Sequence, residues 1–411
     1  MATRVVRRDA QRPTRTSLSW RREPSVPSSG KVCSFWLAGK CTRNPCRFLH
    51  SETVATTSYA ALPNHSASKE SHYSQRHVKK TQNKMCDYWV TGNCVHGENC
   101  KYLHSWSWGD ELSMLAQLEG HKKAVTGITL PTGSDKLFSG SKDGTVRVWD
   151  CNTAQCIGIF DMGSAVGCLI SEGEWVFVGI ENAVKAVNIQ TNAELTLSAP
   201  GGQVYTMSTT NEMLLAGVHD GSILAWTFNS GTNLFEATAS LKGHTGSVVS
   251  LVFGAGRLYS GSTDNTIRVW DLANMQCIHT LNKHSEVVMS LVCWDQYLLS
   301  CSLDQTLKIW AATEAGDLEV VYTHNEEHGI LSLRGMPDAQ GKPILLCSCN
   351  DNTVRLYELP SFADRGRAFT KQEVRTIEVG PGGLFFTGDG TGRVSVWRLS
   401  GDSSALSDKS G

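Results

Sequence analysis

From residue 112 onward, apolar and polar residues alternate in short runs that return after roughly 40 residues. One run, Thr145 to Trp149, reads Thr-Val-Arg-Val-Trp and follows the pair Asp143-Gly144. Alternation with a period of two predicts a strand with one buried face, and an Asp-Gly or Asp-Asn pair before it predicts a tight turn between antiparallel strands. The pattern therefore predicts an all-β domain of repeated hairpins over residues 112–400.

Three copies of the repeat are complete, and four weaker copies fill the intervals. A complete copy contains a His, a Ser-rich segment, a turn Asp and a final Trp, and such copies span residues 120–150, 243–271 and 283–310. The weaker copies span residues 178–189, 216–228, 347–359 and 387–399. The copies resemble WD40 repeats, and seven of them imply a seven-bladed β-propeller. Residues 112–118 would supply the outer strand of the blade that ends at Leu399, which would close the ring.

The resemblance also implies a structural tetrad in the complete repeats, formed by the His, a Ser or Thr, the turn Asp and the Trp. Its expected members are His121, Asp143 and Trp149; His244, Asp264 and Trp270; and His284, Asp304 and Trp310. Because His and Asp recur at the same place in several repeats, we interpret them as scaffold and not as catalytic groups. The second repeat has Glu181-Asn182 and Val187 at the turn and Trp positions, so its blade should be looser.

Two short segments before the repeats each contain three cysteines and one histidine at closely matched intervals. The ligand sets are Cys33, Cys41, Cys46 and His50, and Cys86, Cys94, Cys100 and His104. Thiolate and imidazole groups are the preferred ligands of tetrahedral zinc, and four of them leave no open position for an activated water. The spacing predicts two CCCH zinc fingers, at residues 31–51 and 84–105, each folding around one structural zinc ion.

Aromatic and basic residues accompany the ligands in both fingers. The candidate RNA contacts are Phe35, Trp36, Phe48, Tyr88, Trp89, Tyr102, Lys31, Arg43, Arg47, Lys84 and Lys101. Aromatic faces stack on unpaired bases, and cations bind phosphates. The segments resemble the CCCH fingers of tristetraprolin and muscleblind, which implies single-stranded RNA, with messenger RNA as the expected class. The cysteine spacings are shorter than in tristetraprolin, so its AU-rich target is not implied. In the alternative interpretation, Trp36 and Trp89 only cover the zinc site as a small core.

Charge divides the chain into two parts. Residues 1–110 contain 17 Lys and Arg against 7 Asp and Glu, a net charge of +10, whereas the remainder has a net charge of −11. Nucleic acid is therefore expected at the N-terminal part. Residues 1–30 are predicted to be a disordered basic arm, which could contact RNA, direct import into the nucleus or an organelle, or remain a solvated tail. Residues 52–83 are predicted to be a flexible linker, and residues 401–411 a disordered tail.

Several classes of function find no support. There is no run of 18 or more apolar residues, no secretory signal and no recognisable catalytic motif. We therefore expect that the protein is not an enzyme, does not associate with a membrane and has no small-molecule substrate. The eight cysteines outside the fingers lie in expected strands, which favours a reducing compartment. The expected location is the nucleus, with the cytoplasm as the alternative.

The combination of modules resembles plant proteins that join two CCCH fingers to a WD40 propeller. It implies an RNA-binding adaptor whose propeller recruits a protein partner. In the alternative, the propeller is the substrate receptor of a cullin-type ubiquitin ligase and binds the ligase adaptor, because Arg147 and Arg268 resemble part of the docking motif of such receptors. Asn152 and Ala273 stand where that motif has a basic residue. A role as a DNA-binding regulator is disfavoured, since CCCH fingers offer no evident helix for the major groove.

Overall fold

A computed structural model describes residues 81–400, except for 211, 212, 230, 233 and 315. The predicted basic arm (1–30), the first zinc finger (31–51), most of the linker and the C-terminal tail (401–411) lie outside the described residues. The predictions about them stay predictions.

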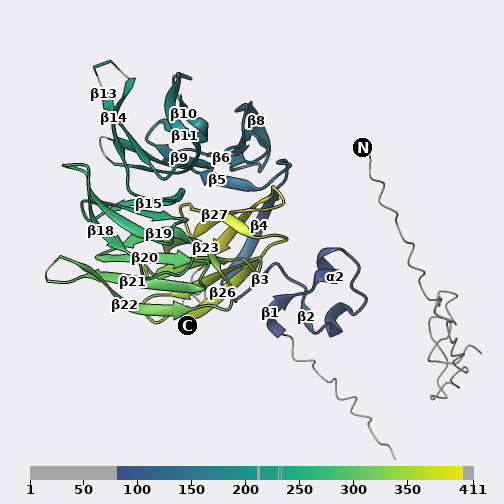
Figure 1. The fold of residues 1–411 in the computed structure, drawn as a ribbon. Helices are drawn as coiled ribbons and strands as arrows, with labels where there is room; N and C mark the ends of the chain where they lie inside the picture. Colours follow the sequence, from purple (N-terminus) through teal and green to yellow (C-terminus); the bar gives the residue numbers. More distant parts are fainter. Residues whose placement is uncertain (1–80, 211–212, 230, 233, 315, 401–411) are drawn as a thin grey trace, which may run out of the picture. The chain divides into compact units, whose positions relative to one another are not determined.

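Antiparallel strands make up the repeat region from residue 112 to residue 399 (Figure 1). Three of its sheets are built from four consecutive strands each: β5 (Val125–Thr129), β6 (Lys136–Ser141), β7 (Thr145–Asp150) and β8 (Cys156–Asp161); β15 (Val248–Gly254), β16 (Arg257–Ser262), β17 (Ile267–Asp271) and β18 (Gln276–Leu281); and β19 (Val288–Trp294), β20 (Tyr297–Ser302), β21 (Thr306–Ala312) and β22 (Leu318–Asn325). Each is a meander in which neighbours in sequence are neighbours in the sheet.

Three further sheets complete the ring. One has six strands: β9 (Cys168–Glu172), β10 (Trp175–Asn188), β11 (Glu194–Thr209), β12 (Met213–Val218), β13 (Ile223–Asn229) and β14 (Leu234–Leu241). In each of the other two sheets, one strand from before the repeats pairs with strands from the C-terminal part of the chain. β3 (Ser107–Trp108) joins β23 (Ile330–Pro337), β24 (Pro343–Cys349), β25 (Thr353–Glu358) and β26 (Ala363–Phe369). β4 (Leu112–Leu118) joins β27 (Val374–Val379), β28 (Leu384–Asp389) and β29 (Val394–Leu399). The architecture of the described residues is an all-β propeller.

The prediction of seven separate blades is wrong, because the described residues form six propeller sheets. The expected second and third blades are joined, since β10 and β11 are long enough to run through both and Glu181 pairs with Gln203 at their junction. In the complete repeats, a loop with a His separates one blade from the next. Between the expected second and third blades, Pro200-Gly201-Gly202 stands in place of this loop. These residues lie within β11, so the strand continues from one expected blade into the next.

Glycines in the second strand of several blades allow neighbouring blades to approach closely. A Cβ atom at Gly261 would lie 2.8 Å from Val288 Cγ1 of the next blade, and one at Gly388 would lie 2.6 Å from Val125 Cγ1. The glycine of the Ser-Gly-Ser segment is thus explained by packing between blades. Hydrophobic side chains fill the remaining space, and Trp270, Trp310 and Trp397 are among the largest that are fully buried.

The ring closes as the sequence predicts. β4 pairs with β29 in antiparallel register, from Leu112 opposite Leu399 to Leu118 opposite Val394. In Figure 1 the blue strand β4 lies among the yellow strands of the C-terminal part. The first and last strands of the propeller are therefore held in one sheet.

The second zinc finger consists of short elements before the propeller. They are β1 (Thr81–Met85), α2 (Asp87–Val90), the 3-10 helix η1 (Gly97–Asn99) and β2 (Tyr102–Leu103), and β1 pairs with β2. Gly92, with φ of +73°, ends the turn after α2, where Asn93 N–H donates to Tyr88 O at 2.7 Å. No helix of the described residues is long and apolar enough to cross a membrane.

Candidate metal centre

Four side chains of the second finger converge on one point. Cys86, Cys94, Cys100 and His104 each offer a ligand atom, and these atoms all lie within 4.8 Å of one another. Cys86 precedes α2, Cys100 follows η1 and His104 follows β2. The pairing of β1 with β2, together with a hydrogen bond of 2.9 Å from Cys86 N–H to Leu103 O, brings the first and last ligands together.

The donor set fits a zinc ion. Cys86 and Cys100 are buried and their Sγ atoms are 3.7 Å apart. This agrees with two thiolates bound at about 2.3 Å to one tetrahedral zinc, which places them about 3.8 Å from each other. His104 Nε2 is buried without a hydrogen-bond partner among the described residues, and such a nitrogen is costly unless a ligand takes up its lone pair.

The protein backbone favours the thiolate form of Cys86. Burial acts to raise the pKa of this thiol, but the backbone N–H groups of Trp89 and Tyr88, with the neighbouring thiols, donate hydrogen bonds to it. The resulting pKa lies below the ordinary value of cysteine. Since zinc binds the thiolate, the first turn of α2 prepares this ligand for the metal.

The aromatic candidates of this finger fall into two groups. Trp89 is half-buried, stacks on His104 with ring centroids 5.8 Å apart, and packs against Trp106 at 5.5 Å. Tyr88 and Tyr102 are exposed, at 70% and 38% of their surface. The indole of Trp89 thus covers a metal ligand, whereas the two tyrosines face solvent. The contact with Trp106 was not anticipated from the sequence, although its place two residues after His104 is a usable signal.

The basic candidates of this finger, Lys84 and Lys101, are exposed, and Lys101 has an interaction within the protein. The candidate ligands Cys33, Cys41, Cys46 and His50, and the candidate RNA contacts Lys31, Phe35, Trp36, Arg43, Arg47 and Phe48, lie outside the described residues.

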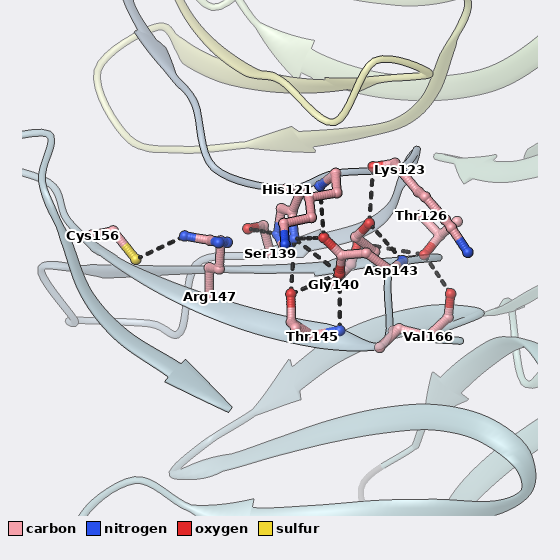
Figure 2. Close-up of polar contacts among 12 residues, drawn as sticks. His121, Lys123, Thr126, Ser139, Gly140, Asp143, Thr145, Arg147, Cys156 and Val166 are labelled. Carbon is pink, nitrogen blue, oxygen red and sulfur yellow. Dashed lines mark hydrogen bonds and ion pairs between the residues drawn. The ribbon is translucent and has the colours of Figure 1, made fainter. Parts of the chain in front are cut away.

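Each complete repeat contains a buried hydrogen-bonded network, drawn for the first blade in Figure 2. In this blade, Ser139 Oγ lies 2.8 Å from His121 Nε2 (Figure 2). Trp149 Nε1–H donates to the same Ser139 Oγ at 2.8 Å. On its other side, His121 Nδ1 lies 3.2 Å from Asp143 Oδ2, and Asp143 also accepts from Thr145 Oγ1 at 2.7 Å. The serine hydroxyl therefore donates to Nε2, and Nδ1–H donates to the carboxylate.

Two other blades repeat this network. The members are His244, Ser260, Asp264, Thr266 and Trp270, and His284, Ser300, Asp304, Thr306 and Trp310. The sequence analysis did not number the serines or threonines, which occur at the start of the Ser-rich segment and two residues after the turn Asp. A Ser-His-Asp order is reminiscent of a hydrolase, but each of these serine side chains is fully buried and bound to an indole. The networks are structural.

A different network replaces the tetrad in the β23–β26 blade. Glu326 accepts hydrogen bonds from Arg355 and from the hydroxyl of Tyr357, and Arg355 also donates to Asp351 at 3.0 Å. Burial acts to raise the pKa of Glu326, but His324, Tyr357 and Arg355 outweigh it, and the pKa is lowered. Glu326 thus remains an anion that anchors the blade. Sequence analysis missed it because the repeat places a His near this position.

Arg147 and Arg268, the candidates for docking a ubiquitin-ligase adaptor, are half-buried. Arg147 Nη1 lies 3.6 Å from Cys156 Sγ, and Arg268 Nη1 lies 3.5 Å from Cys277 Sγ. A Cβ atom at Gly120 would lie 2.5 Å from Arg147 Nη1, and one at Gly243 would lie 2.7 Å from Arg268 Nη1. Each guanidinium group thus packs between the outer strand of its blade and the loop that precedes that blade.

Comparisons with known proteins agree with this architecture. The family described as WD domain, G-beta repeat, matches residues 112–150, 235–271 and 275–311. The WD40 propeller domain of Doa1, a solved structure, has a TM-score of 0.61 at 21% identity, over 70% of this chain and 97% of that one, a likeness of fold.

Two plant proteins are similar over almost their whole length. Zinc finger CCCH domain-containing protein 17 of Oryza sativa subsp. japonica is 57% identical over 403 residues, which cover 91% of this chain and 92% of the rice protein. Zinc finger CCCH domain-containing protein 48 of Arabidopsis thaliana is 54% identical over 407 residues, covering 93% and 94%. The chain therefore belongs to the plant zinc finger CCCH domain-containing proteins that carry WD40 repeats.

Proposed function

We propose that the protein is a zinc-dependent RNA-binding adaptor, in which the CCCH fingers hold single-stranded RNA and the propeller recruits a protein partner. The observation that carries the proposal is the surface of the second finger, where Tyr88 and Tyr102 are exposed around a Cys₃His cluster. Exposed aromatic rings on a small rigid unit provide flat surfaces on which unpaired bases can stack.

Zinc acts here as the folding element of the RNA-binding surface. The finger is too short to bury a core of its own, so its tyrosines are held in place only while the four ligands are bound to the metal. The first finger repeats the ligand pattern, and we propose a second structural zinc ion there. The net charge of +10 on residues 1–110 attracts the RNA backbone to this part of the chain.

The test is a fluorescence-anisotropy titration of the full-length, zinc-loaded protein with pools of single-stranded RNA and with matched duplex DNA. Tyr88→Ala and Tyr102→Ala should each weaken RNA binding by about 5- to 150-fold, because one stacked base is worth about 1–3 kcal/mol. Tyr297→Ala is the matched control, since this tyrosine is 48% exposed but lies on the propeller strand β20. Equal binding of RNA and duplex DNA, indifferent to both finger tyrosines, would overturn the proposal.

A further inference from the structure

Four exposed lysines lie on adjoining loops of two neighbouring blades. Lys122 and Lys123 belong to the loop between β4 and β5, Lys142 to the turn between β6 and β7, and Lys371 to the loop between β26 and β27. We call these four residues the basic patch. The first three are held together by backbone contacts, because Lys142 N–H donates to Ala124 O at 2.9 Å and Lys122 N–H donates to Asp143 Oδ2 at 2.8 Å. Figure 2 shows Lys123 on the same loop as His121.

A glycine-rich turn connects Lys371 to the other three lysines. A Cβ atom at Gly392 would lie 2.8 Å from Lys123 O, and one at Gly390 would lie 2.6 Å from Gln372 Oε1, next to Lys371. Gly390 N–H also donates to Glu373 O at 3.0 Å. The segment Gly390-Thr391-Gly392 therefore lies between the two lysine-bearing loops. Because it has no large side chain, it places no bulky group between the lysines.

Acidic residues near the basic patch are occupied by other partners. Asp143 belongs to the His121 network, Glu373 pairs with Arg375, Glu119 pairs with Arg393, and Asp389 is buried. In contrast, the four patch lysines form no ion pair within the described part of the chain. The patch is thus positive although residues 111–411 carry a net charge of −11.

Direct contacts tie the end of the second finger to this place. Phe369 N–H donates to Trp106 O at 2.8 Å, and Trp108 on β3 pairs with Arg367 on β26. Trp106 comes two residues after the candidate ligand His104, and Phe369 comes two residues before Lys371. A strand of RNA that leaves the second finger therefore has the basic patch close by.

We propose that the basic patch continues the RNA site of the fingers and binds backbone phosphates of the same single strand. This inference rests on the proposed function. A protein partner is less well matched, because protein interfaces depend on apolar or aromatic anchors, and none of the exposed large apolar side chains of the described residues lies in these loops. Lysines with no bulky group between them can contact the phosphates of a flexible RNA strand whatever its base sequence.

The test compares two full-length triple variants by titration with a short RNA of about 4 nucleotides and a long RNA of about 16 nucleotides, the range of single-strand site sizes. The patch variant is K123Q/K142Q/K371Q. The control variant, K242Q/K283Q/K342Q, has the same charge change at exposed lysines of other blades. With the long RNA, the slope of log K against the logarithm of the salt concentration should be less negative by about 2 in the patch variant. Each phosphate contact with a single strand contributes about 0.7 to this slope, and three lysines are replaced. The short RNA should bind all proteins equally.

The possible results separate this inference from the function beneath it. If the unaltered protein binds neither RNA, the proposed function fails and the inference falls with it. If it binds both RNAs, and the patch and control variants bind the long RNA alike, only the basic patch is excluded. Loss of binding to an Asp- and Glu-rich peptide in the patch variant, with RNA binding unchanged, would also overturn the inference and assign the patch to an acidic protein. Equal melting temperatures of the two variants establish that both are folded.

Discussion

Histidines of the same chain serve two different purposes, and their hydrogen bonds distinguish them. In His121, His244 and His284, both ring nitrogens have partners, a serine hydroxyl on one side and a carboxylate on the other. In His104, Nε2 is buried without a hydrogen-bond partner among the described residues, and one ring nitrogen lies within 4.8 Å of three thiols. Only this last arrangement leaves a lone pair for a metal ion.

Replacing His104 should remove one zinc ion without unfolding the propeller. We expect His104→Ala to lower the bound zinc by one ion per chain, because three thiolates alone leave the tetrahedral shell open. Metal content measured by atomic emission on the purified protein is the readout. His96→Ala is the matched control, since His96 is an exposed histidine of the same finger outside the cluster. Unchanged zinc in the His104 variant would exclude the histidine as a ligand.

Among the structural elements, β4 has a larger role than its length suggests. It comes from the N-terminal side of the propeller but completes the sheet of β27, β28 and β29, so it holds the two ends of the ring together. Its side chains alternate as a half-buried strand requires: Leu112 and Leu118 are each 4% exposed, whereas Leu115 is 48% exposed. Leu118 packs in the same cluster as Val125 and Trp149 of the first blade.

Truncation at the two leucines should therefore have unequal effects on stability. Leu118→Ala should lower the free energy of unfolding by about 2–5 kcal/mol, because it leaves a cavity at the seam of the ring. Leu115→Ala on the same strand should change it by no more than about 0.5 kcal/mol. Urea unfolding followed by tryptophan fluorescence measures both values. Similar losses in the two variants would show that β4 does not seal the propeller through its buried face.

For the whole molecule, the three tetrads make stability depend on pH. Burial lowers the pKa of His121, His244 and His284 below the ordinary value, against the opposing effect of the aspartates. The pKa values of Asp264 and Asp304 are also lowered, and that of Asp143 falls to about 2, because threonine hydroxyls, the neighbouring histidines and backbone N–H groups outweigh the effect of burial. The unfolded chain thus binds protons at a higher pH than the folded one at all six groups. Their contribution to stability is present above the unfolded pKa values and is lost on acidification.

We expect the propeller to become less stable between about pH 7.5 and about pH 5.5, where the unfolded chain takes up protons on histidine first. The measurement is the urea midpoint at both pH values for the unaltered protein, for His244→Gln and for His328→Gln. The His244 variant should show a smaller change than the unaltered protein. His328 is exposed and serves as the control, so its replacement should leave the change intact. The comparison between variants cancels any effect of zinc release. An equal pH dependence in all three proteins would exclude the tetrad as its source.

Much of the architecture follows from patterns that are local in the sequence. The spacing of Cys86, Cys94, Cys100 and His104 predicts a metal site, because a short stretch of chain can close around one ion, and the four side chains do converge. The alternation of residues 145–149, repeated along the chain, determines antiparallel hairpins, and the strand at residues 112–118 follows from the need to close a ring. For the metal site and the hairpins, the physical reason lies within one finger or one repeat, whereas the closing strand pairs with β29 at the other end of the propeller.

Other properties depend on residues that meet only in three dimensions. The merging of two expected blades results from the pairing of Glu181 with Gln203, and the covering of His104 by Trp89 results from the fold of the finger. The approach of the Lys371 loop to the Lys123 loop, on either side of Gly390-Thr391-Gly392, requires the closed ring, because the two loops are far apart in the sequence. The spacing of the cysteines and histidines and the alternation of the repeats predict the zinc ligands and the strands, because both patterns are encoded over short stretches of sequence. Which aromatic and basic side chains stay exposed depends on the folded protein, because packing between distant segments buries some of them and leaves others at the surface.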